Sequence, residues 1–385
     1  MYLLQDLRTQ GRCCKGLRFF ATLANDRITL KCVSPVLIKK CFNLGMEKAM
    51  NDFLDSLICR QTFDTQDLIN DHPPKFYNGN KQLVYDICCP PGCTHRGQLA
   101  FSRWYAMVLP EYLSSLEHQT DISERKGYFE YEPSEDSTQM EWYLNFAHYD
   151  LFCAYGGSLF AQDEMQVAEH PALSSLREAL LDSNIKPFTV ESQQPTPILI
   201  RGVERRCAIA TDKNPAQGRP FGLYGNNFGR ATSDAIKQAT KPLNPPTITN
   251  IIAMEAPAGG QGYYSMAEIE YILKTTFTGF SAARIESQLE LPQAPSLMIH
   301  TGFWGCGAYG GNRVLMALLQ LLSARLSQVN CLVFHTSDAM GSEALATAQQ
   351  ILDRDLVPDD SPVKVSALIE KIHGMEFQWG FSDGN

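Results

Sequence analysis

The sequence has no long hydrophobic run and no excess of positive charge, and each absence excludes a class of protein. No window of its 385 residues approaches the roughly 18 uncharged apolar residues that a membrane-spanning helix needs. The amino terminus, MYLLQDLRTQGRCCKG, lacks the apolar core of a secretory signal peptide. The formal net charge of -9 argues against a broad surface for duplex nucleic acid. We therefore expect no nucleic-acid partner and no membrane partner.

The sequence also lacks a disulfide framework of the kind found in small secreted domains. Its 12 cysteines are spread over a long chain, although two pairs, Cys13–Cys14 and Cys88–Cys89, are adjacent. This distribution favours free thiols in a reducing compartment. We expect a cytoplasmic or nuclear protein, and a protein delivered into the cytosol of a host cell would have the same composition.

Residues 1–96 are predicted to form a helical, cysteine-rich accessory region. They carry Met50, Phe53, Leu54 and Leu57 at helical spacing and end in the breaker cluster CCPPGCTHRG. Within that cluster, two interpretations of CCPPGCTH are open: a zinc site, or a Pro/Gly turn with incidental thiols. The second is favoured because no second, regularly spaced ligand pair follows, so we predict neither a metal nor a cofactor. The four residues concerned are Cys88, Cys89, Cys93 and His95.

Residues 97–385 are predicted to form an α/β domain with a central mixed sheet between helices. Apolar runs of strand length, such as TPILIRG, TNIIAMEA, SLMIHTG and VNCLVFHT, alternate with helical patterns such as HPALSSLREALL and SMAEIEYILKTTF. This alternation is typical of a buried sheet covered on both faces. Residues 212–230 and 240–249 are rich in Gly, Pro and Asn and are predicted to be loops.

The glycine stretch TGFWGCGAYGGN predicts a binding loop for a diphosphate. We expect a strand over residues 296–300, a loop over 302–311, a helix over 312–326 and a second strand over 330–334. Glycines allow backbone amides to approach a ligand closely, and the helix that follows would offer unpaired N–H groups and a partial positive charge. Trp304 is expected to pack beneath the loop.

The same stretch satisfies the GxGxxG pattern of dinucleotide-binding folds between Gly305 and Gly310. A nicotinamide-dependent dehydrogenase is therefore an alternative. The next strand ends in VFHTS, however, with no acidic residue at its tip to bind a ribose. A diphosphate loop of another kind is favoured.

A second candidate site is the stretch LNFAHYDLFCAYGGSLFAQDEMQVAEHPAL, residues 144–173. Two glycines precede Gln162-Asp163-Glu164 at the expected start of a helix. One carboxylate could hold a sugar hydroxyl while the other acts as general acid or base. The alternative is an acidic first turn that only complements the helix dipole.

These residues carry a family resemblance. GGSLFAQDE resembles a shortened form of the signature of poly(ADP-ribose) glycohydrolases, and LNFAH and TGFWGCGAYGGN are similar to two further motifs of that family. The resemblance extends in order over about residues 97–338 and implies a macrodomain fold. It also implies that ADP-ribose and ADP-ribosylated protein are the partners.

The resemblance implies a role for individual residues. Glu164 matches the catalytic glutamate, and Asp163 matches the acidic residue that holds the distal ribose. The sequence departs from the family pattern in three ways. Ser158 stands in place of the third signature glycine and the loop to Gln162 is shorter, Asn145 and Asp163 replace an aspartate and a glutamate, and His148 replaces an asparagine that touches the ribose. The residues expected to contact ADP-ribose are Glu130, Asn145, His148, Gly156, Gly157, Gln162, Tyr224, Gly305, Cys306, Gly307, Ala308, Tyr309, Gly310 and Gly311.

The expected function is that of an ADP-ribosylhydrolase. The altered acidic stretch favours mono- or terminal ADP-ribose, including arginine-linked ADP-ribose, over long polymers. The alternative is a binding module that reads ADP-ribose without cleaving it, because loss of one acidic group at Asn145 can abolish turnover while affinity is kept.

Overall fold

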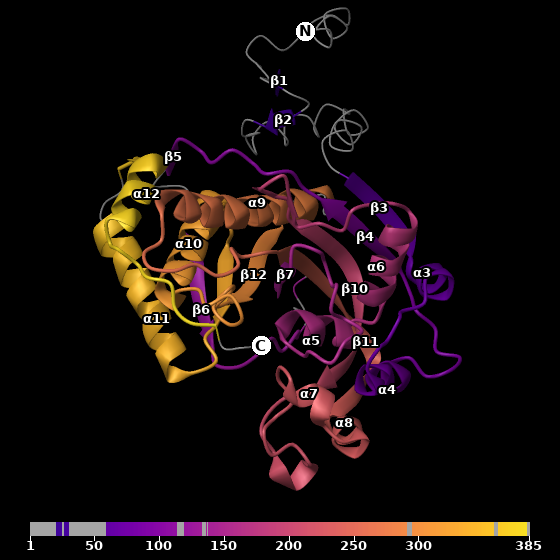
Figure 1. Cartoon of the computed structure of the whole chain (residues 1–385). Coiled ribbons are helices and arrows are strands. Elements are labelled where there is room, and N and C mark those ends of the chain that lie inside the picture. Colours follow the sequence, from indigo (N-terminus) through magenta and orange to yellow (C-terminus); the bar gives the residue numbers. More distant parts are fainter. Residues whose placement is uncertain are drawn as a thin grey trace, which may run out of the picture.

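An eight-stranded mixed sheet organises the structure (Figure 1). The computed structural model describes residues 21–24, 27–30, 59–113, 119–132, 136, 138–290, 295–357 and 361–382. In spatial order the strands are β3 (Cys59–Asp64), β4 (Gln98–Arg103), β10 (Ile198–Ile209), β11 (Thr240–Met254), β7 (Gln139–Phe146), β12 (Ser296–Gly302), β13 (Cys331–His335) and β6 (Asp121–Arg125). This sheet confirms the predicted fold class.

The sheet has an antiparallel half and a parallel half. β3, β4, β10 and β11 pair antiparallel, whereas β11, β7, β12, β13 and β6 pair parallel. Parallel neighbours bring their carboxyl ends to one edge of the sheet, which is where ligands bind in many α/β folds. Three two-stranded sheets complete the strands: β1 (Ala21–Ala24) with β2 (Arg27–Leu30), β5 (Tyr112–Leu113) with β14 (Val363–Lys364), and β8 (Val190–Glu191) with β9 (Gln194–Pro195).

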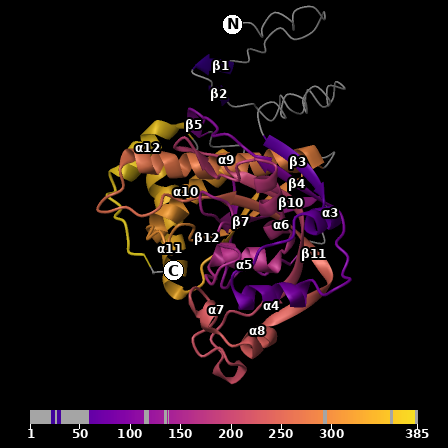
Figure 2. The ribbon, with the colours of Figure 1, turned by 45° about the vertical axis from the view of Figure 1, so that its right-hand side comes forward.

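Helices cover both faces of the sheet (Figures 1 and 2). One group is α9 (Met266–Glu290), α10 (Arg313–Leu326), α11 (Ala339–Gln350), the π-helical segment η3 (Ile351–Leu356) and α12 (Val365–His373). A second group is α3 (Thr65–Asp71), α5 (Gln162–Glu169) and α6 (Ala172–Asp182). A third group lies beside α5 and comprises α4 (Gly79–Cys88), the 3-10 turn η2 (Pro215–Gln217), α7 (Asn227–Arg230) and α8 (Ser233–Ala239).

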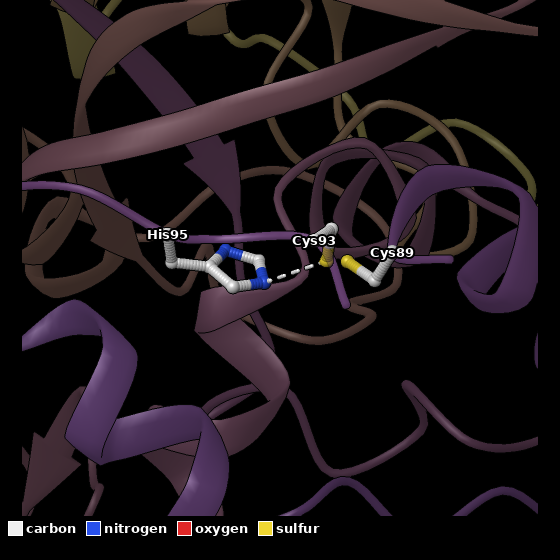
Figure 3. A group of neighbouring side chains, drawn as sticks. All are labelled: Cys89, Cys93 and His95. Carbon is white, nitrogen blue, oxygen red and sulfur yellow. Dashed lines mark hydrogen bonds between the residues drawn. The ribbon is translucent and has the colours of Figure 1, made fainter. Parts of the chain in front are cut away.

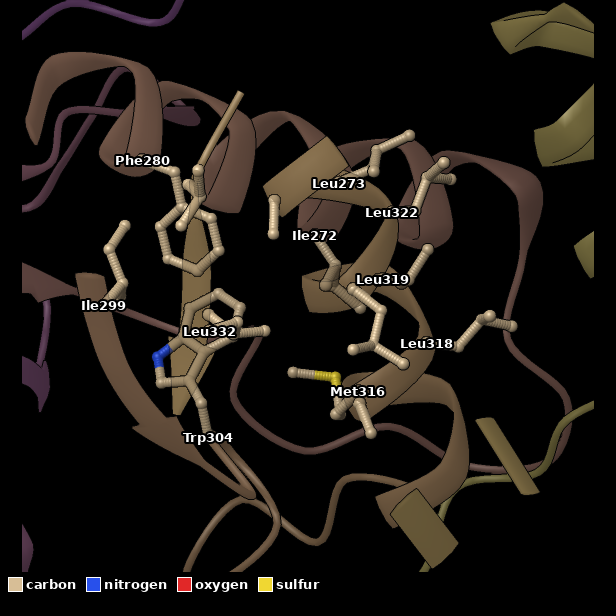
Figure 4. Close-up of a cluster of buried hydrophobic side chains, with 14 of the residues drawn as sticks. Ile272, Leu273, Phe280, Ile299, Trp304, Met316, Leu318, Leu319, Leu322 and Leu332 are labelled. Atoms are coloured by element: carbon tan, nitrogen blue, oxygen red, sulfur yellow. The ribbon is translucent and has the colours of Figure 1, made fainter. Parts of the chain in front are cut away.

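The alternation of side chains along β11 shows how the two faces are built. Ile252 and Met254 belong to the core under α9 and α10, whereas Ile251 and Ala253 belong to the core under α3 and α6. Successive residues of a strand point to opposite faces, so a strand buried on both sides is apolar at every position. Figure 4 shows part of the larger core, in which Trp304 packs with side chains of α9 and α10.

Two expectations need correction, and a third is not tested. Residues 240–249 are not a loop: they form the first part of β11 and pair with β10, with register shifts where the two strands lose their alignment. Residues 59–96 do not belong to a separate region, because β3 pairs with β4 in the main sheet. The helical pattern at 50–57 lies outside the described residues.

The expectation of free thiols is wrong for two cysteines. Cys88, the last residue of α4, forms a disulfide with Cys207 on β10. Both side chains are buried in the small core shared by α4, α7 and α8. The disulfide therefore fastens α4 to the antiparallel half of the sheet. In the described part of the chain, no helix is both long enough and apolar enough to cross a membrane.

Candidate functional site

Two loops begin at the carboxyl ends of neighbouring parallel strands. β12 ends at Gly302 and leads into the glycine loop, residues 303–311. β7 ends at Phe146 and leads through residues 147–161 to α5. Because β7 and β12 are parallel neighbours, these two connections leave the same edge of the sheet. The arrangement brings together stretches that are far apart in the sequence.

The glycine loop is held by close backbone packing. Gly305 has a φ of 76°, and a Cβ at this position would lie 2.4 Å from Cβ of Ala256. Trp304 is buried beneath the loop and donates a hydrogen bond from Nε1 to the carbonyl of Met254 at 2.9 Å. The structure thus confirms Trp304 as a packing anchor and shows why Gly305 cannot carry a side chain without strain.

The donors that the loop offers differ from those expected. Asn312 caps α10, and its Oδ1 accepts hydrogen bonds from the amides of Val314 and Leu315, each at 3.1 Å. These helix amides are therefore already used. In contrast, the backbone hydrogen bonds found among the described residues do not use the amides of Gly307 and Ala308. A diphosphate would be held by the loop itself rather than by the first turn of α10.

The last residues of the described chain support the glycine loop from outside. Gly380 donates a backbone hydrogen bond to the carbonyl of Gly310 at 2.8 Å, and Trp379 stacks on Tyr264 with ring centroids 4.1 Å apart. A Cβ on Gly310 would lie 3.0 Å from the amide nitrogen of Ser382. Nothing in the sequence predicts this contact, because it joins two segments without regular periodicity.

The carboxylates of Asp163 and Glu164 lie in the first turn of α5, and the residues are only 7% and 5% exposed. Gln162 fixes the start of this helix on β7: its Nε2 donates to the carbonyl of Leu144 at 3.0 Å, and its Oε1 accepts from the amide of Phe146 at 2.8 Å. The side-chain amide of Gln162 is thus used to place the two carboxylates.

Hydrogen bonds from Asn145 and from the amide of Ala161 hold the two carboxylates. Nδ2 of Asn145, fully buried on β7, donates to Oδ1 of Asp163 at 3.2 Å and to Oε1 of Gln166 at 2.9 Å. Oε2 of Glu164 accepts from the amide of Ala161 at 2.9 Å, which caps α5. Glu164 therefore caps the start of α5 through Oε2, whereas Oε1 takes no part in this bond.

The electrostatics of the pair follow from its burial. Burial raises the pKa of Asp163, and the nearby negative charge of Glu164 raises it further. The hydrogen bond from Asn145 and the positive charge of Lys81 act in the opposite direction. The carboxyl group of Asp163 therefore retains a proton more readily than an isolated carboxyl group does.

Lys81 on α4 is the most important residue that sequence reasoning missed. Burial lowers its pKa to about 8, and the negative charges of Glu164 and Asp163 oppose that shift. Its Nζ lies 4.9 Å from the ring centroid of Phe160 and 5.5 Å from that of Phe228. A lysine in an amphipathic helix is normally a surface residue, so no pattern in the sequence indicates that Lys81 is buried.

Tyr309 ties the glycine loop to the residue that follows β11. Its hydroxyl donates to Oε1 of Glu255 at 3.2 Å, and Glu255 follows the last residue of β11. Burial raises the pKa of Tyr309, and the charges of Glu255 and Asp163 contribute to the shift. The phenol of the glycine loop is thus within electrostatic reach of the acidic pair. Burial also raises the pKa of the Cys306 thiol to about 12, so this loop residue stays protonated.

The two signature glycines serve packing. A Cβ on Gly156 would lie 2.3 Å from the carbonyl oxygen of Lys75, and the carbonyl of Gly156 accepts hydrogen bonds from the amides of Tyr77 and Asn78 at 2.8 and 3.1 Å. Gly157 forms a turn through a hydrogen bond to Ala154. These contacts fix the acidic stretch against the segment that leads into α4.

Three further predicted contacts lie around this edge. His148 accepts a hydrogen bond at Nδ1 from the amide of Asp150 at 3.2 Å. Glu130 is exposed and lies 3.7 Å from Nη1 of Arg125. Tyr224, from the loop 212–230, is nearly parallel to Tyr128, with ring centroids 6.4 Å apart. The structure gives these side chains neighbours but does not test their predicted contacts with a ligand.

Comparison with known proteins supports the family resemblance for part of the chain. Residues 199–343 match the family model described as poly(ADP-ribose) glycohydrolase, macro domain fold. The match runs from β10 into α11 and includes the glycine loop but not the acidic stretch. It confirms the resemblance to this macrodomain family over the matched residues.

Among solved structures, the chain is similar to poly(ADP-ribose) glycohydrolase from Thermomonospora curvata, with a TM-score of 0.39 and 14% identity over 75% of this chain and 85% of that chain. It is also similar to the Deinococcus radiodurans enzyme in complex with ADP-ribose, with a TM-score of 0.36 and 14% identity over 81% of this chain and 99% of that chain. A search of curated proteins found no match.

Proposed function

We propose that the protein is an ADP-ribosylhydrolase that removes mono- or terminal ADP-ribose from modified proteins. The observation that carries this proposal is the buried Asp163–Glu164 pair within electrostatic reach of Tyr309 in the glycine loop. A diphosphate site and a proton-holding carboxyl pair at one edge of a sheet are what cleavage of a glycosidic bond next to a diphosphate requires.

Each of these residues has a separate role in the hydrolysis. The amides of Gly307 and Ala308 bind the diphosphate, and Asp163 holds the hydroxyls of the distal ribose. Glu164 gives a proton to the leaving group on the protein side as the bond to C1″ breaks. Water attacks C1″, and the proton that the water loses returns to the carboxyl pair. The products are free ADP-ribose and the unmodified side chain.

The preference for mono- or terminal ADP-ribose rests on the loop between Gly157 and Gln162. This loop is held on two sides, because Gly156 contacts Lys75 while a Cβ on Gly229 would lie 2.7 Å from Cβ of Ser158. Widening the space around the distal ribose for the next unit of a polymer would break these contacts. Arginine-linked ADP-ribose is one suitable substrate, since a carboxylate such as Asp163 can face a guanidinium.

A second candidate function is a reader that binds ADP-ribose without cleaving it. Two observations favour it: Asn145 stands where the family has an aspartate, and Oε2 of Glu164 is occupied by the amide of Ala161. A nicotinamide-dependent dehydrogenase is less well supported, because β13 ends in His335 rather than in an acidic residue. A calorimetric titration in which NADH binds more tightly than ADP-ribose would favour the dehydrogenase.

The test is to incubate the full chain separately with arginine-ADP-ribosylated protein and with polymer-modified protein. We expect free ADP-ribose to be released from the first substrate faster than from the second, and not to be released by Glu164→Gln. Tight binding of both substrates with no release by the unmodified protein would establish the reader instead.

A further inference from the structure

A cluster of two cysteines and a histidine lies apart from the acidic pair, between the carboxyl end of α4 and β4 (Figure 3). The ligand atoms of Cys89, Cys93 and His95 all lie within 4.8 Å of one another, and Sγ of Cys93 is 3.6 Å from Nε2 of His95. We propose that these three residues bind a zinc ion.

The observed separation fits zinc. Zinc binds sulfur at about 2.3 Å and histidine nitrogen at about 2.0–2.1 Å with tetrahedral angles, which places such ligand atoms about 3.6 Å apart. Two thiolates and an imidazole favour zinc over magnesium or calcium, which prefer oxygen ligands. The three protein ligands leave a fourth tetrahedral position for water.

His95 is oriented for metal binding by a buried carboxylate. Its Nδ1 lies 3.2 Å from Oε2 of Glu204 on β10, and both side chains are buried. If Nδ1 carries the proton, the lone pair of Nε2 points toward Cys93 and is free to bind the ion. A carboxylate that holds the second nitrogen is the usual companion of a metal-binding histidine.

Glu204 is itself held in place. It accepts hydrogen bonds from Nη1 of Arg206 at 2.7 Å and from the amide of Arg96 at 3.2 Å. Arg206 also donates to the carbonyls of Cys88 and Thr94 on either side of the cluster. Glu204 and Arg206 therefore fix both His95 and the backbone that carries Cys89 and Cys93.

The backbone of the turn brings the thiols together. The amide of Cys93 donates to the carbonyl of Pro90 at 2.9 Å, and Gly92 has a φ of 82°, so the chain folds back toward Cys89. Cys88 is engaged in the disulfide with Cys207 and is not a ligand. Sequence reasoning favoured incidental thiols because it lacked a second ligand pair, and the carboxylate on β10 that orients His95 lies 109 residues away.

With three protein ligands and one open position, the site differs from structural zinc sites, which have four protein ligands, but zinc bound here would still brace the fold. It would tie the turn after α4 to β10 through His95 and Glu204, beside the disulfide that joins the same two elements. The proposal is independent of the proposed function, because none of the ligands contacts the acidic pair or the glycine loop among the interactions described above.

The experiment uses the full chain, purified anaerobically without reductant, so that the free thiols stay reduced and the Cys88–Cys207 disulfide stays intact. Bound zinc is measured by elemental mass spectrometry for the unmodified protein, Cys93→Ser, His95→Gln and the control Cys331→Ser, which alters a free cysteine on β13. We expect the unmodified protein and the control to retain zinc, and the two ligand variants to lose one equivalent. Equal zinc content in all four proteins, or no zinc in the unmodified protein, would overturn the proposal.

A second measurement does not depend on the ligand variants folding. Cobalt added to the metal-free, unmodified protein should give the charge-transfer band of thiolate ligands and the visible spectrum of a tetrahedral ion. Glu204→Gln keeps all three ligands and should weaken zinc affinity about 10–100-fold in a chelator competition. A cobalt spectrum without thiolate bands, or an unchanged affinity in Glu204→Gln, would contradict the site as described.

Discussion

The glycine loop and the acidic stretch share one edge of the sheet, but they are held in different ways. The loop is fixed by backbone packing and by one anchor, Trp304. The acidic pair depends on side chains from separate elements, namely Asn145 on β7 and Lys81 on α4. The glycine loop thus depends on close backbone approach, which its glycines allow, whereas the acidic pair depends on side chains that the fold brings from separate elements.

Because the glycine loop and the acidic pair are held differently, a change in the acidic pair should abolish cleavage of the glycosidic bond and leave the binding of ADP-ribose intact. We expect Glu164→Gln to lower the rate of ADP-ribose release about 10²–10⁴-fold, because a carboxamide cannot supply the proton. The affinity for free ADP-ribose should change little, as measured by calorimetry. The control is Glu370→Gln, an exposed glutamate on α12. If Glu164→Gln lowered both the affinity for ADP-ribose and the rate of its release, the role of Glu164 would be to stabilise the structure of the site.

A change in the glycine loop should have the opposite effect. Gly305→Ala places a methyl group 2.4 Å from Cβ of Ala256 at a φ of 76°. We expect ADP-ribose affinity to fall by at least about 10-fold, and the free energy of unfolding to fall by about 1–3 kcal/mol. Gly374→Ala is the control, because its nearest neighbour would be 3.4 Å away. Full affinity in Gly305→Ala would contradict a diphosphate site in this loop.

Lys81 offers a way to alter the charge of the acidic pair without touching it. In Lys81→Met the positive charge that opposes protonation of Asp163 is removed, so the pKa of Asp163 should rise. The limb of the rate profile that follows the protonation of Asp163 should therefore move up by about one pH unit. Lys237→Met, which alters an exposed lysine on α8, should leave the profile unchanged. An unshifted limb in Lys81→Met would contradict the coupling.

The smallest expected effect concerns stability. The pKa of Asp163 is raised in the folded state, so the folded protein binds more protons than the unfolded chain above the unfolded pKa of about 3.9. Its stabilising contribution is present below that pH and is lost as pH rises through the folded pKa, by at most about 1.4 kcal/mol per pH unit. Urea unfolding of Asp163→Asn should therefore show a weaker decline with pH than that of the unmodified protein. Equal slopes would contradict the raised pKa, and Asp355→Asn, an exposed site, is the control.

The sequence predicted the elements around the glycine loop closely. The expected strand, helix and strand over residues 296–300, 312–326 and 330–334 correspond to β12, α10 and β13. Continuous apolar runs identify buried parallel strands, and the helical period identifies the helix between them. Asn312, expected as the first helical residue, is the N-cap.

Other parts could not be predicted because their determinants are not local. Residues 240–249 contain three prolines and resemble a loop, yet they pair with β10 where the register shifts. The position of Lys81 near the acidic pair depends on the packing of α4 beside α5, which no local pattern indicates. Glu255 lies in no recognisable motif, and its place near the glycine loop is evident only from the hydrogen bond that Tyr309 donates to it. The roles assigned to the acidic pair and the glycine loop in binding ADP-ribose remain predictions.

The most direct test of the account is a crystal structure of Glu164→Gln with ADP-ribose bound. We predict that the diphosphate accepts hydrogen bonds from the amides of Gly307 and Ala308. We also predict that C1″ of the distal ribose faces residues 163 and 164, with the ribose hydroxyls at about 2.6–3.2 Å from Asp163. A diphosphate bound away from the glycine loop, or a distal ribose directed away from these two residues, would contradict a single site built from the two stretches.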